Sequence, residues 1–144
     1  MPYRKPVPKK QLLKYLKEIK LLASGFDLLS DHVIITDSNA NIMYANGAAE
    51  RSTGFRVKEM IGKNPGDLWG GKMSPSFYRK MWRVIKTKKK PFVGSVRNLK
   101  KDGTAYWQKL CIVPVLDDKS GLKYFLGIEP KINGEENQNA SGGD

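Results

Sequence analysis

The segment NLKKDGTAYWQKLCIVPVLDDKSG, residues 98–121, decides the fold. Its long apolar run lies between two clusters rich in Asp and Gly, at 101–103 and 117–121, a pattern typical of strands joined by tight turns. Together with YFLGI at 124–128, the segment predicts three consecutive antiparallel strands. We expect these strands to span residues 92–99, 104–115 and 122–128.

The alternation of side chains along these strands indicates a sheet that is largely apolar on both faces. Successive side chains of a strand point to opposite faces, so Gln108 and Leu110 share one face while Trp107 and Cys111 share the other. One layer of helices covers only one face. We therefore expect the second face to be covered by a helix that precedes the domain or by another subunit.

The residues before this segment predict two further strands and several short helices. His32–Asp37 and Asn41–Asn46 are β-rich runs joined by a short turn. Residues 47–89 are helical in pieces, and the Ser-Pro pair at 74–75 is typical of a helix N-terminus, here of a helix that reaches residue 86. Two strands, then helices, then three antiparallel strands predict an α+β domain.

Composition divides the chain into four parts. Residues 1–8, with three prolines, predict a flexible basic arm, and residues 9–24 predict an amphipathic helix with lysines on its polar side. Residues 31–132 form the α+β domain, and residues 133–144, which contain no large apolar side chain, predict a disordered tail. We expect the helix at 9–24 either to dock on its own domain or to mediate dimerisation.

The charge of the chain is strongly basic and unevenly distributed. Lys and Arg number 26 against 14 Asp and Glu, for a net charge of +12, and basic residues concentrate at 1–20 and 83–101. Such patches attract nucleic acid or anionic lipid through counterion release and surface potential. Two interpretations stay open: a nucleic-acid-associated regulatory protein that uses these patches, or solvated faces that keep a small protein soluble.

Composition also excludes several classes of site. A single cysteine, Cys111, forms no internal disulfide and no cysteine-rich zinc site, and a single histidine, His32, excludes the usual multi-histidine metal sites. The sequence shows no nucleophile paired with a base and no phosphate-binding glycine loop, so we do not expect an enzyme. Because it has no apolar run of about 18 residues and no secretion signal, we expect a cytoplasmic protein.

Residues 31–132 resemble a PAS sensor domain. The resemblance is carried by the order and spacing of ITDSNANIMYAN (35–46), AAERSTGF (48–55), MIGKNPGDLWGG (60–71), FYRKMWRVI (77–85) and the strand segments quoted above. It implies a five-stranded antiparallel sheet with short helices on one face, around an interior pocket that binds a ligand or is filled by side chains. It further implies a stand-alone sensory or interaction module of signal transduction, as in two-component signalling, that forms a homodimer or a heterodimer with a signalling protein.

The flavin-binding, light-sensing branch of this family offers a comparison for the pocket. The polar side chains that hydrogen-bond the flavin in that branch align here with Asn98, Gln108 and Glu129. Its reactive cysteine is replaced by Pro65, and the residues that hold the flavin phosphate are replaced by Gly66 and Trp69. The resemblance therefore implies no light-driven thiol adduct, while a non-covalent flavin or another small organic ligand stays open. Haem is not expected, because residues 74–86 contain no histidine to serve as an axial ligand.

These considerations give two sets of candidate site residues. The pocket candidates are Ile34, Thr36, Met60, Leu68, Asn98, Gln108, Leu110 and Glu129. The candidates for a dimer interface are Leu12, Leu16, Ile19, Trp107, Tyr124 and Leu126. We expect His32, at the start of a strand, to be satisfied by solvent or by a backbone group. Because Lys131-Ile132-Asn133 stands where related domains carry Asp-Ile-Thr, we expect output through the N-terminal helix or through a partner in trans.

Overall fold

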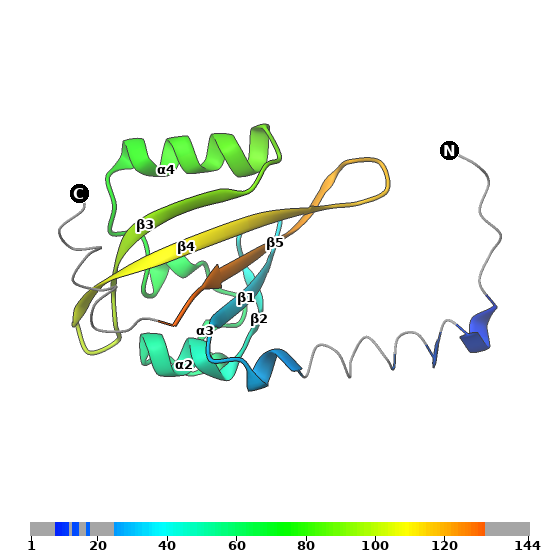
Figure 1. Cartoon of the computed structure of the whole chain (residues 1–144), viewed down its shortest axis with the longest axis horizontal. Helices are drawn as coiled ribbons and strands as arrows, with labels where there is room; N and C mark the ends of the chain where they lie inside the picture. The colour runs from blue at the N-terminus through cyan, green and yellow to red at the C-terminus, as the bar shows by residue number, and fades with distance from the viewer. Residues whose placement is uncertain (1–7, 12, 15–16, 18–24, 132–144) are drawn as a thin grey trace.

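The computed structural model describes residues 8–11, 13, 14, 17 and 25–131. Within them the chain forms one antiparallel sheet of five strands, in the order β2-β1-β5-β4-β3, with short helices on one face (Figure 1). The predicted arm, N-terminal helix and tail lie largely outside the described residues, and so do Leu12, Leu16 and Ile19.

The element bounds follow the sequence pattern closely. The strands are β1 (His32–Asp37), β2 (Ile42–Ala45), β3 (Phe92–Leu99), β4 (Ala105–Leu116) and β5 (Leu122–Glu129). The helical elements are η1 (Gly25–Leu28), α2 (Gly47–Thr53), α3 (Val57–Met60), η2 (Pro65–Asp67), α4 (Pro75–Trp82) and η3 (Arg83–Thr87). Every strand begins and ends within about one residue of the range that strand periodicity predicts, and the α+β fold class is confirmed.

The helix predicted over 74–86 begins as expected and ends differently. Ser74 Oγ accepts a hydrogen bond from the backbone N–H of Phe77 at 3.3 Å, as an N-cap residue does. From Arg83 to Thr87, however, the chain widens into the π-helix η3. The backbone N–H of Lys88 closes this turn by donating to the carbonyl of Arg83 at 2.9 Å. π-turns of this kind are rare and occur frequently at functional sites.

Asp37 shapes the turn between β1 and β2. Its Oδ1 accepts hydrogen bonds from the backbone N–H groups of Asn39 and Asn41, each at 2.9 Å. These bonds, above all the one from Asn41, favour the ionised carboxylate and lower the pKa of Asp37. Ala40, in the same turn, has a φ of 65° in the left-handed region, a conformation that the carboxylate helps to hold.

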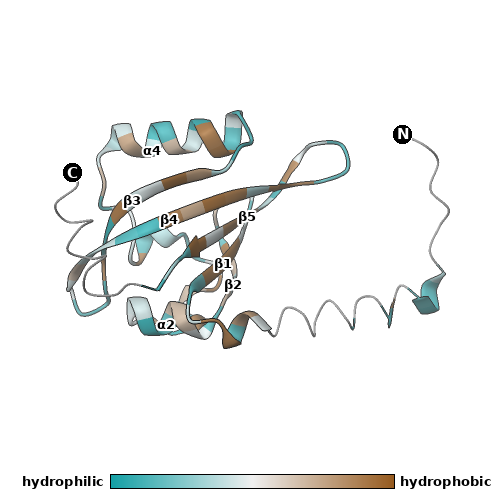
Figure 2. Cartoon of the chain, viewed as in Figure 1, coloured by the Kyte–Doolittle hydropathy of each residue, from teal (hydrophilic) through white to brown (hydrophobic). Residues whose placement is uncertain are grey.

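The apolar core lies on the helix side of the sheet in two clusters. The first joins β1 and β2 to the helices that follow them: Ile34, Ile42, Ala45, Ala49, Met60 and Trp69. The second joins α4 and η3 to the sheet: Met81, Ile85, Phe92 and Phe125. Figure 2 shows hydrophobic residues along the middle of the strands and hydrophilic residues at the hairpin ends. The sheet therefore supports two packed regions side by side.

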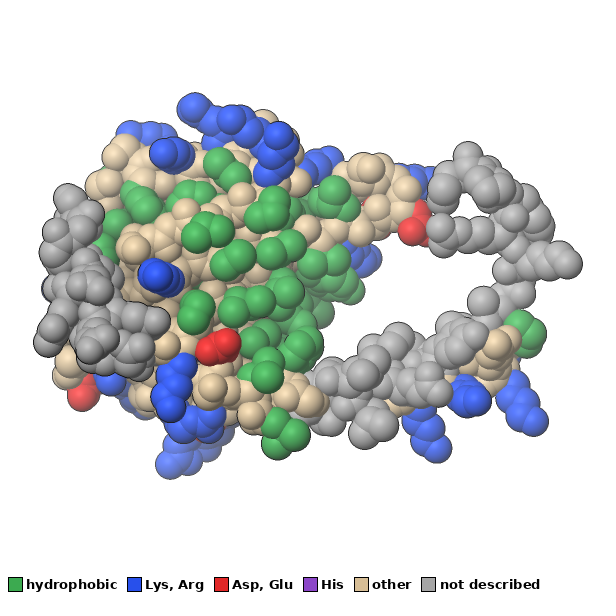
Figure 3. Space-filling view, in the orientation of Figure 1, with side chains coloured by type: hydrophobic (Ala, Val, Ile, Leu, Met, Phe, Trp, Pro, Cys, Tyr) green, Lys and Arg blue, Asp and Glu red, His purple; other side chains and the backbone are tan. Residues whose placement is uncertain are grey.

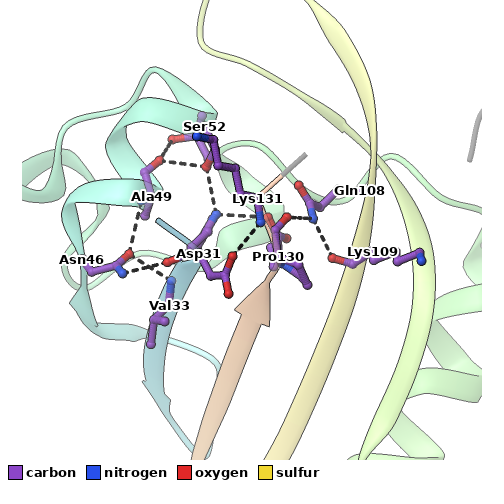
Figure 4. A network of polar contacts seen from close by, with 12 residues as sticks. Asp31, Val33, Asn46, Ala49, Ser52, Gln108, Lys109, Pro130 and Lys131 are labelled. Carbon is purple, nitrogen blue, oxygen red and sulfur yellow. Dashed lines mark hydrogen bonds and ion pairs between the residues drawn. The ribbon is translucent and has the colours of Figure 1, made fainter. Parts of the chain in front are cut away.

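The side chain of Asn46 connects the N-terminal segments of the domain through hydrogen bonds (Figure 4). This fully buried side chain caps α2 and makes hydrogen bonds to two other segments. Its Oδ1 accepts from the backbone N–H of Val33 at 2.9 Å and of Ala49 at 3.3 Å. Its Nδ2 donates to the carbonyls of Phe26 and Asp31, at 2.8 and 2.9 Å. One side chain thus satisfies backbone groups of η1, β1 and α2.

The two ends of the domain also meet in this region. The Asp31 carboxylate accepts a hydrogen bond from the backbone N–H of Lys131 at 2.8 Å (Figure 4). Gln108 Nε2 donates to the carbonyl of Pro130 at 2.9 Å, which holds the chain just after β5. Asp31 therefore contacts Asn46 through its backbone carbonyl and the exit of the domain through its side chain.

We expect Asn46→Ala to lower the free energy of unfolding by about 3 kcal/mol, because it removes a helix cap and leaves several buried backbone groups without partners. Chemical denaturation followed by circular dichroism measures this change. The matched control is Ser74→Ala, which removes one exposed cap bond and is expected to cost about 1 kcal/mol. Equal losses for the two variants would contradict the central role of Asn46.

Candidate functional site

A cavity of about 400 Å³ lies between the inner face of the sheet and the helices. Side chains of β1, β3, β4 and β5 line it on one side, and residues 64–71 together with α4 and η3 line it on the other. Aromatic side chains contribute much of the wall: Trp69, Tyr78, Trp82 and Phe125. A cavity of this size lies within the range of small-molecule sites.

Two buried polar residues on the cavity wall lie at the C-terminal ends of their strands. Asn98 of β3 and Glu129 of β5 line the cavity and are only 3% and 5% exposed. Among the residues that the structure describes, Asn98 Nδ2 and Glu129 Oε2 make no hydrogen bond of good geometry, although Glu129 Oε2 lies 3.0 Å from His32 Nδ1. A buried polar group left unsatisfied costs about 1–3 kcal/mol. Asn98 therefore brings to the wall a donor without a hydrogen bond, and Glu129 brings an acceptor whose close neighbour is the imidazole of His32.

His32 lies beside Glu129, its partner across the β1–β5 pairing. Its Nδ1 is 3.0 Å from Glu129 Oε2 and 3.1 Å from Ser52 Oγ, and only the contact with Ser52 has hydrogen-bond geometry. The ring of Trp69 meets the imidazole edge to face, with ring centroids 5.2 Å apart. His32 is 2% exposed, so the expectation that solvent or a backbone group satisfies it is wrong. Three side chains from other segments enclose it instead.

Tyr106 adds a further buried polar group next to Asn98. The two residues face each other across the pairing of β3 and β4. The Tyr106 hydroxyl is buried and has no hydrogen-bond partner among the described residues. Burial, and then the negative charge of Glu129, raise the pKa of Tyr106 well above its ordinary value, while the neighbouring Asn98 side chain acts in the opposite direction. The phenol, which like any tyrosine is protonated at physiological pH, adds a buried hydrogen-bond donor beside Asn98.

The structure brings five of the eight pocket candidates to the cavity wall. These are Ile34, Thr36, Asn98, Leu110 and Glu129. All five belong to strands, where the alternation of faces places a side chain reliably. Whether they bind a ligand stays a prediction.

The other three pocket candidates lie elsewhere. Met60 is fully buried in the core cluster around Ile42, and Leu68 packs against the same cluster. Gln108 lies on the inner side of β4, but its amide bonds the carbonyls of Lys109 and Pro130 at the end of the sheet. These three residues complete the core and the domain edge rather than the cavity wall.

Sequence reasoning missed most of the aromatic wall. Tyr78 and Trp82 stand four residues apart on α4, so both project from one side of the helix. Phe125 follows the inner-face alternation of β5, which signals its position in the sequence. Trp69 belongs to no regular element, and only the fold shows that it lies against both the cavity and His32.

The outer face of the sheet carries a broad apolar area. Figure 3 shows hydrophobic side chains gathered over the strands, with Lys and Arg along the borders. Val93 is 72% exposed and Val115 is 39% exposed. Of the predicted interface residues, Trp107, Tyr124 and Leu126 are half-buried side chains of β4 and β5 on this face. The remaining three interface candidates are among the residues that are not described.

The described part of the chain contains neither a metal-binding cluster nor a membrane-spanning helix. No group of three or more His, Cys, Asp or Glu side chains there is arranged to hold a metal ion. No helix in the same residues is long and apolar enough to cross a membrane.

Comparisons with known proteins agree on one family. The family model for the PAS fold matches residues 20–128. The nitrogen fixation regulatory protein of Klebsiella oxytoca is 31% identical over 101 residues, which cover 70% of this chain and 20% of that protein. A blue-light photoreceptor of Listeria innocua is 32% identical over 120 residues, covering 81% of this chain and 47% of the photoreceptor. This chain thus spans about a fifth to a half of the length of these relatives.

A solved structure supports the same conclusion for the fold. The PAS domain of a protein from Colwellia psychrerythraea superposes with a TM-score of 0.70 at 23% sequence identity, covering 80% of this chain and 97% of that one. The family model spans more than half of the chain, and the five-stranded sheet with its short helices is the expected architecture. The chain therefore belongs to the PAS family of sensory domains in signal transduction.

Proposed function

We propose that this PAS domain senses a small, flat organic molecule that binds reversibly in the cavity between the sheet and the helices. The observation that carries the proposal is a cavity of about 400 Å³ whose wall includes Asn98, with no hydrogen bond at its Nδ2, and the buried carboxylate of Glu129, whose Oε2 lies 3.0 Å from His32 Nδ1. A ligand edge that presents an acceptor to Asn98 and a donor to Glu129 gives each group a hydrogen bond that the domain alone does not supply. The buried polar groups lower the stability of the domain alone, and the same groups favour ligand binding.

The shape of the ligand follows from the aromatic wall. Trp82 and Phe125 meet edge to face, with centroids 5.7 Å apart, and Trp69 and Tyr78 line the same cavity. Aromatic side chains bury large areas and favour stacked or edge-to-face contacts with other rings. A planar ligand with a polar edge fits this division of the wall into aromatic and polar parts.

The residues around the cavity favour reversible binding over a covalent adduct. Leu110 and Ile112 line the cavity, so Cys111 between them is directed toward the opposite face of β4. Pro65, on the cavity wall, stands where the resemblance places a reactive cysteine in light-sensing relatives. The Listeria relative is named as a blue-light photoreceptor, but no cysteine of this chain lines the cavity for thiol chemistry.

We expect Asn98→Leu to weaken the binding of riboflavin, a flat probe with donors and acceptors on one edge, about tenfold. The melting temperature is expected to stay the same or rise, because leucine removes a buried donor that has no partner in the folded domain. Fluorescence titration measures binding, and differential scanning calorimetry measures stability.

The control for this experiment is Ser95→Leu, an exposed position on the same strand. It is expected to leave riboflavin binding unchanged. Native mass spectrometry of freshly purified protein shows in parallel whether a small molecule is retained from the cell. A protein that retains none and binds no riboflavin contradicts the proposed sensory role of the cavity.

The outer face of the sheet supports a second proposal, that two such domains associate through it. Leu126 lies at the centre of this face, between Val113 of β4 and Ile35 of β1 in the strand pairings. Exposed apolar areas of this kind mark interaction sites in soluble proteins. A second copy of the domain offers the same apolar area, which is the condition for a symmetric dimer.

We expect light scattering of the full chain to give the mass of a dimer and Leu126→Glu to give the mass of a monomer, because a carboxylate at the centre of the face cannot be desolvated cheaply. Thr104→Glu, which introduces the same charge at an exposed turn position, is expected to remain dimeric. A monomeric mass for the unmodified chain would rule out association through this face.

A further inference from the structure

The helix α4 and its π-helical extension η3 belong to the most basic part of the described chain. Residues 68–101 contain eleven Lys and Arg residues and no Asp or Glu. Figure 3 shows part of this charge as a row of blue side chains along the edge where α4 lies. Neither ion pair found in the described residues involves α4 or η3: one joins His32 to Glu129 and the other joins Lys101 to Glu59. The positive charge of the helix is therefore not neutralised by the domain itself.

One face of this helix forms a shallow, open groove, lined entirely by residues of α4 and η3, that combines basic with aromatic side chains. Its lining includes Tyr78, Arg79, Trp82, Arg83 and Lys86. The two aromatic residues stand four positions apart, and so do the two arginines, so two parallel rows follow the helix. Arg79, Arg83 and Lys86 are exposed, whereas Tyr78 and Trp82 are half-buried.

The half-buried Trp82 lines both the interior cavity, where it packs edge to face on Phe125, and the groove, where Lys86 lies over its ring. The Lys86 ammonium lies over the ring, 6.0 Å from its centroid, and no other described cation is found over this ring. An exposed contact of this kind is weak and is readily exchanged for a stronger one. A planar group that enters between Lys86 and the ring gains a stacking surface and keeps a cation beside it.

We propose that the groove along α4 and η3 binds single-stranded nucleic acid. The phosphates lie against Arg79, Arg83 and Lys86, and a base stacks on Trp82. Proteins that bind single strands without reading sequence combine a positive groove with aromatic stacking platforms. The arginines suit phosphate oxygens because the planar guanidinium donates two parallel hydrogen bonds.

The composition of the helix surface favours this occupant over a membrane. The large exposed hydrophobic residues of the described chain do not include any residue of α4 or η3. A helix that lies in a lipid interface buries an exposed apolar face, which this helix surface lacks. Half-buried aromatic rings between exposed cations are better matched to bases and phosphates than to acyl chains.

The test is fluorescence anisotropy of a labelled 15-nucleotide oligothymidylate with the full chain at increasing salt. We expect binding that weakens steeply with salt, and we expect the double variant Arg79→Ala/Arg83→Ala to bind at least tenfold more weakly at low salt. Loss of two phosphate contacts reduces the slope of log K against log salt by about 1.4. Trp82→Leu is expected to weaken binding about tenfold with the slope unchanged, because it removes stacking and no charge.

The matched control is Lys58→Ala/Lys119→Ala, which removes the same charge from two exposed positions outside the groove. With both double variants compared at about 0.1 M salt, we expect this control to weaken binding less than about threefold, since attraction between exposed charges more than about 10 Å apart is largely screened there. An equal effect of both double variants overturns the proposal, because the total charge then explains binding. So does tighter, Arg79- and Arg83-dependent binding of a poly-glutamate peptide or of phosphatidylserine vesicles. An oligonucleotide that does not bind at low salt, or a folded Trp82→Leu variant with unchanged affinity, overturns it as well.

Discussion

The pairing of the first strand with the last is the constraint on which this domain depends. β1 pairs with β5 along its whole length, from His32 opposite Glu129 to Asp37 opposite Tyr124. Because β5 also pairs with β4, and β4 with β3, this one contact joins an N-terminal hairpin to a C-terminal meander. The entropy cost of closing a long loop grows only slowly with its length, so the helical residues between the two units can be numerous. Those residues then have one place to pack, the inner face of the sheet.

The cavity exists because the inner face is packed from two sides and not from the middle. Ile34 and Trp69 belong to the first core cluster and line the cavity, while Met81, Ile85 and Phe125 belong to the second and line it as well. Protein interiors are normally filled to crystal-like density, so a gap between two clusters sacrifices dispersion contacts. The polar groups at Asn98 and Glu129 add a further cost. A domain that keeps both the cavity and these buried polar groups is less stable than a fully packed one, but it is better suited to binding a small molecule.

Much of this arrangement is visible in the sequence, and the rest depends on contacts between distant segments. The strand bounds are predictable because Asp and Gly mark the turns and apolar side chains alternate between faces, which also places Ile34, Leu110 and Glu129 on the inner side. The order of the strands depends on non-local pairing and is not written in any local pattern. The position of Met60 in the core, and not on the cavity wall, is not predictable because a four-residue helix gives no periodicity from which to judge its buried side. The burial of His32 depends on Trp69, Ser52 and Glu129, none of which is near it in the chain.

Asp31 gives the domain one more property, through the bond between its side chain and the backbone of Lys131. The residues just before β1 and just after β5 are joined through Asp31, so the two ends of the domain lie close together. Such a unit fits between the parts of a longer protein without forcing its flanks apart. The bond also places this junction next to His32, which pairs across the sheet with Glu129 of the cavity wall.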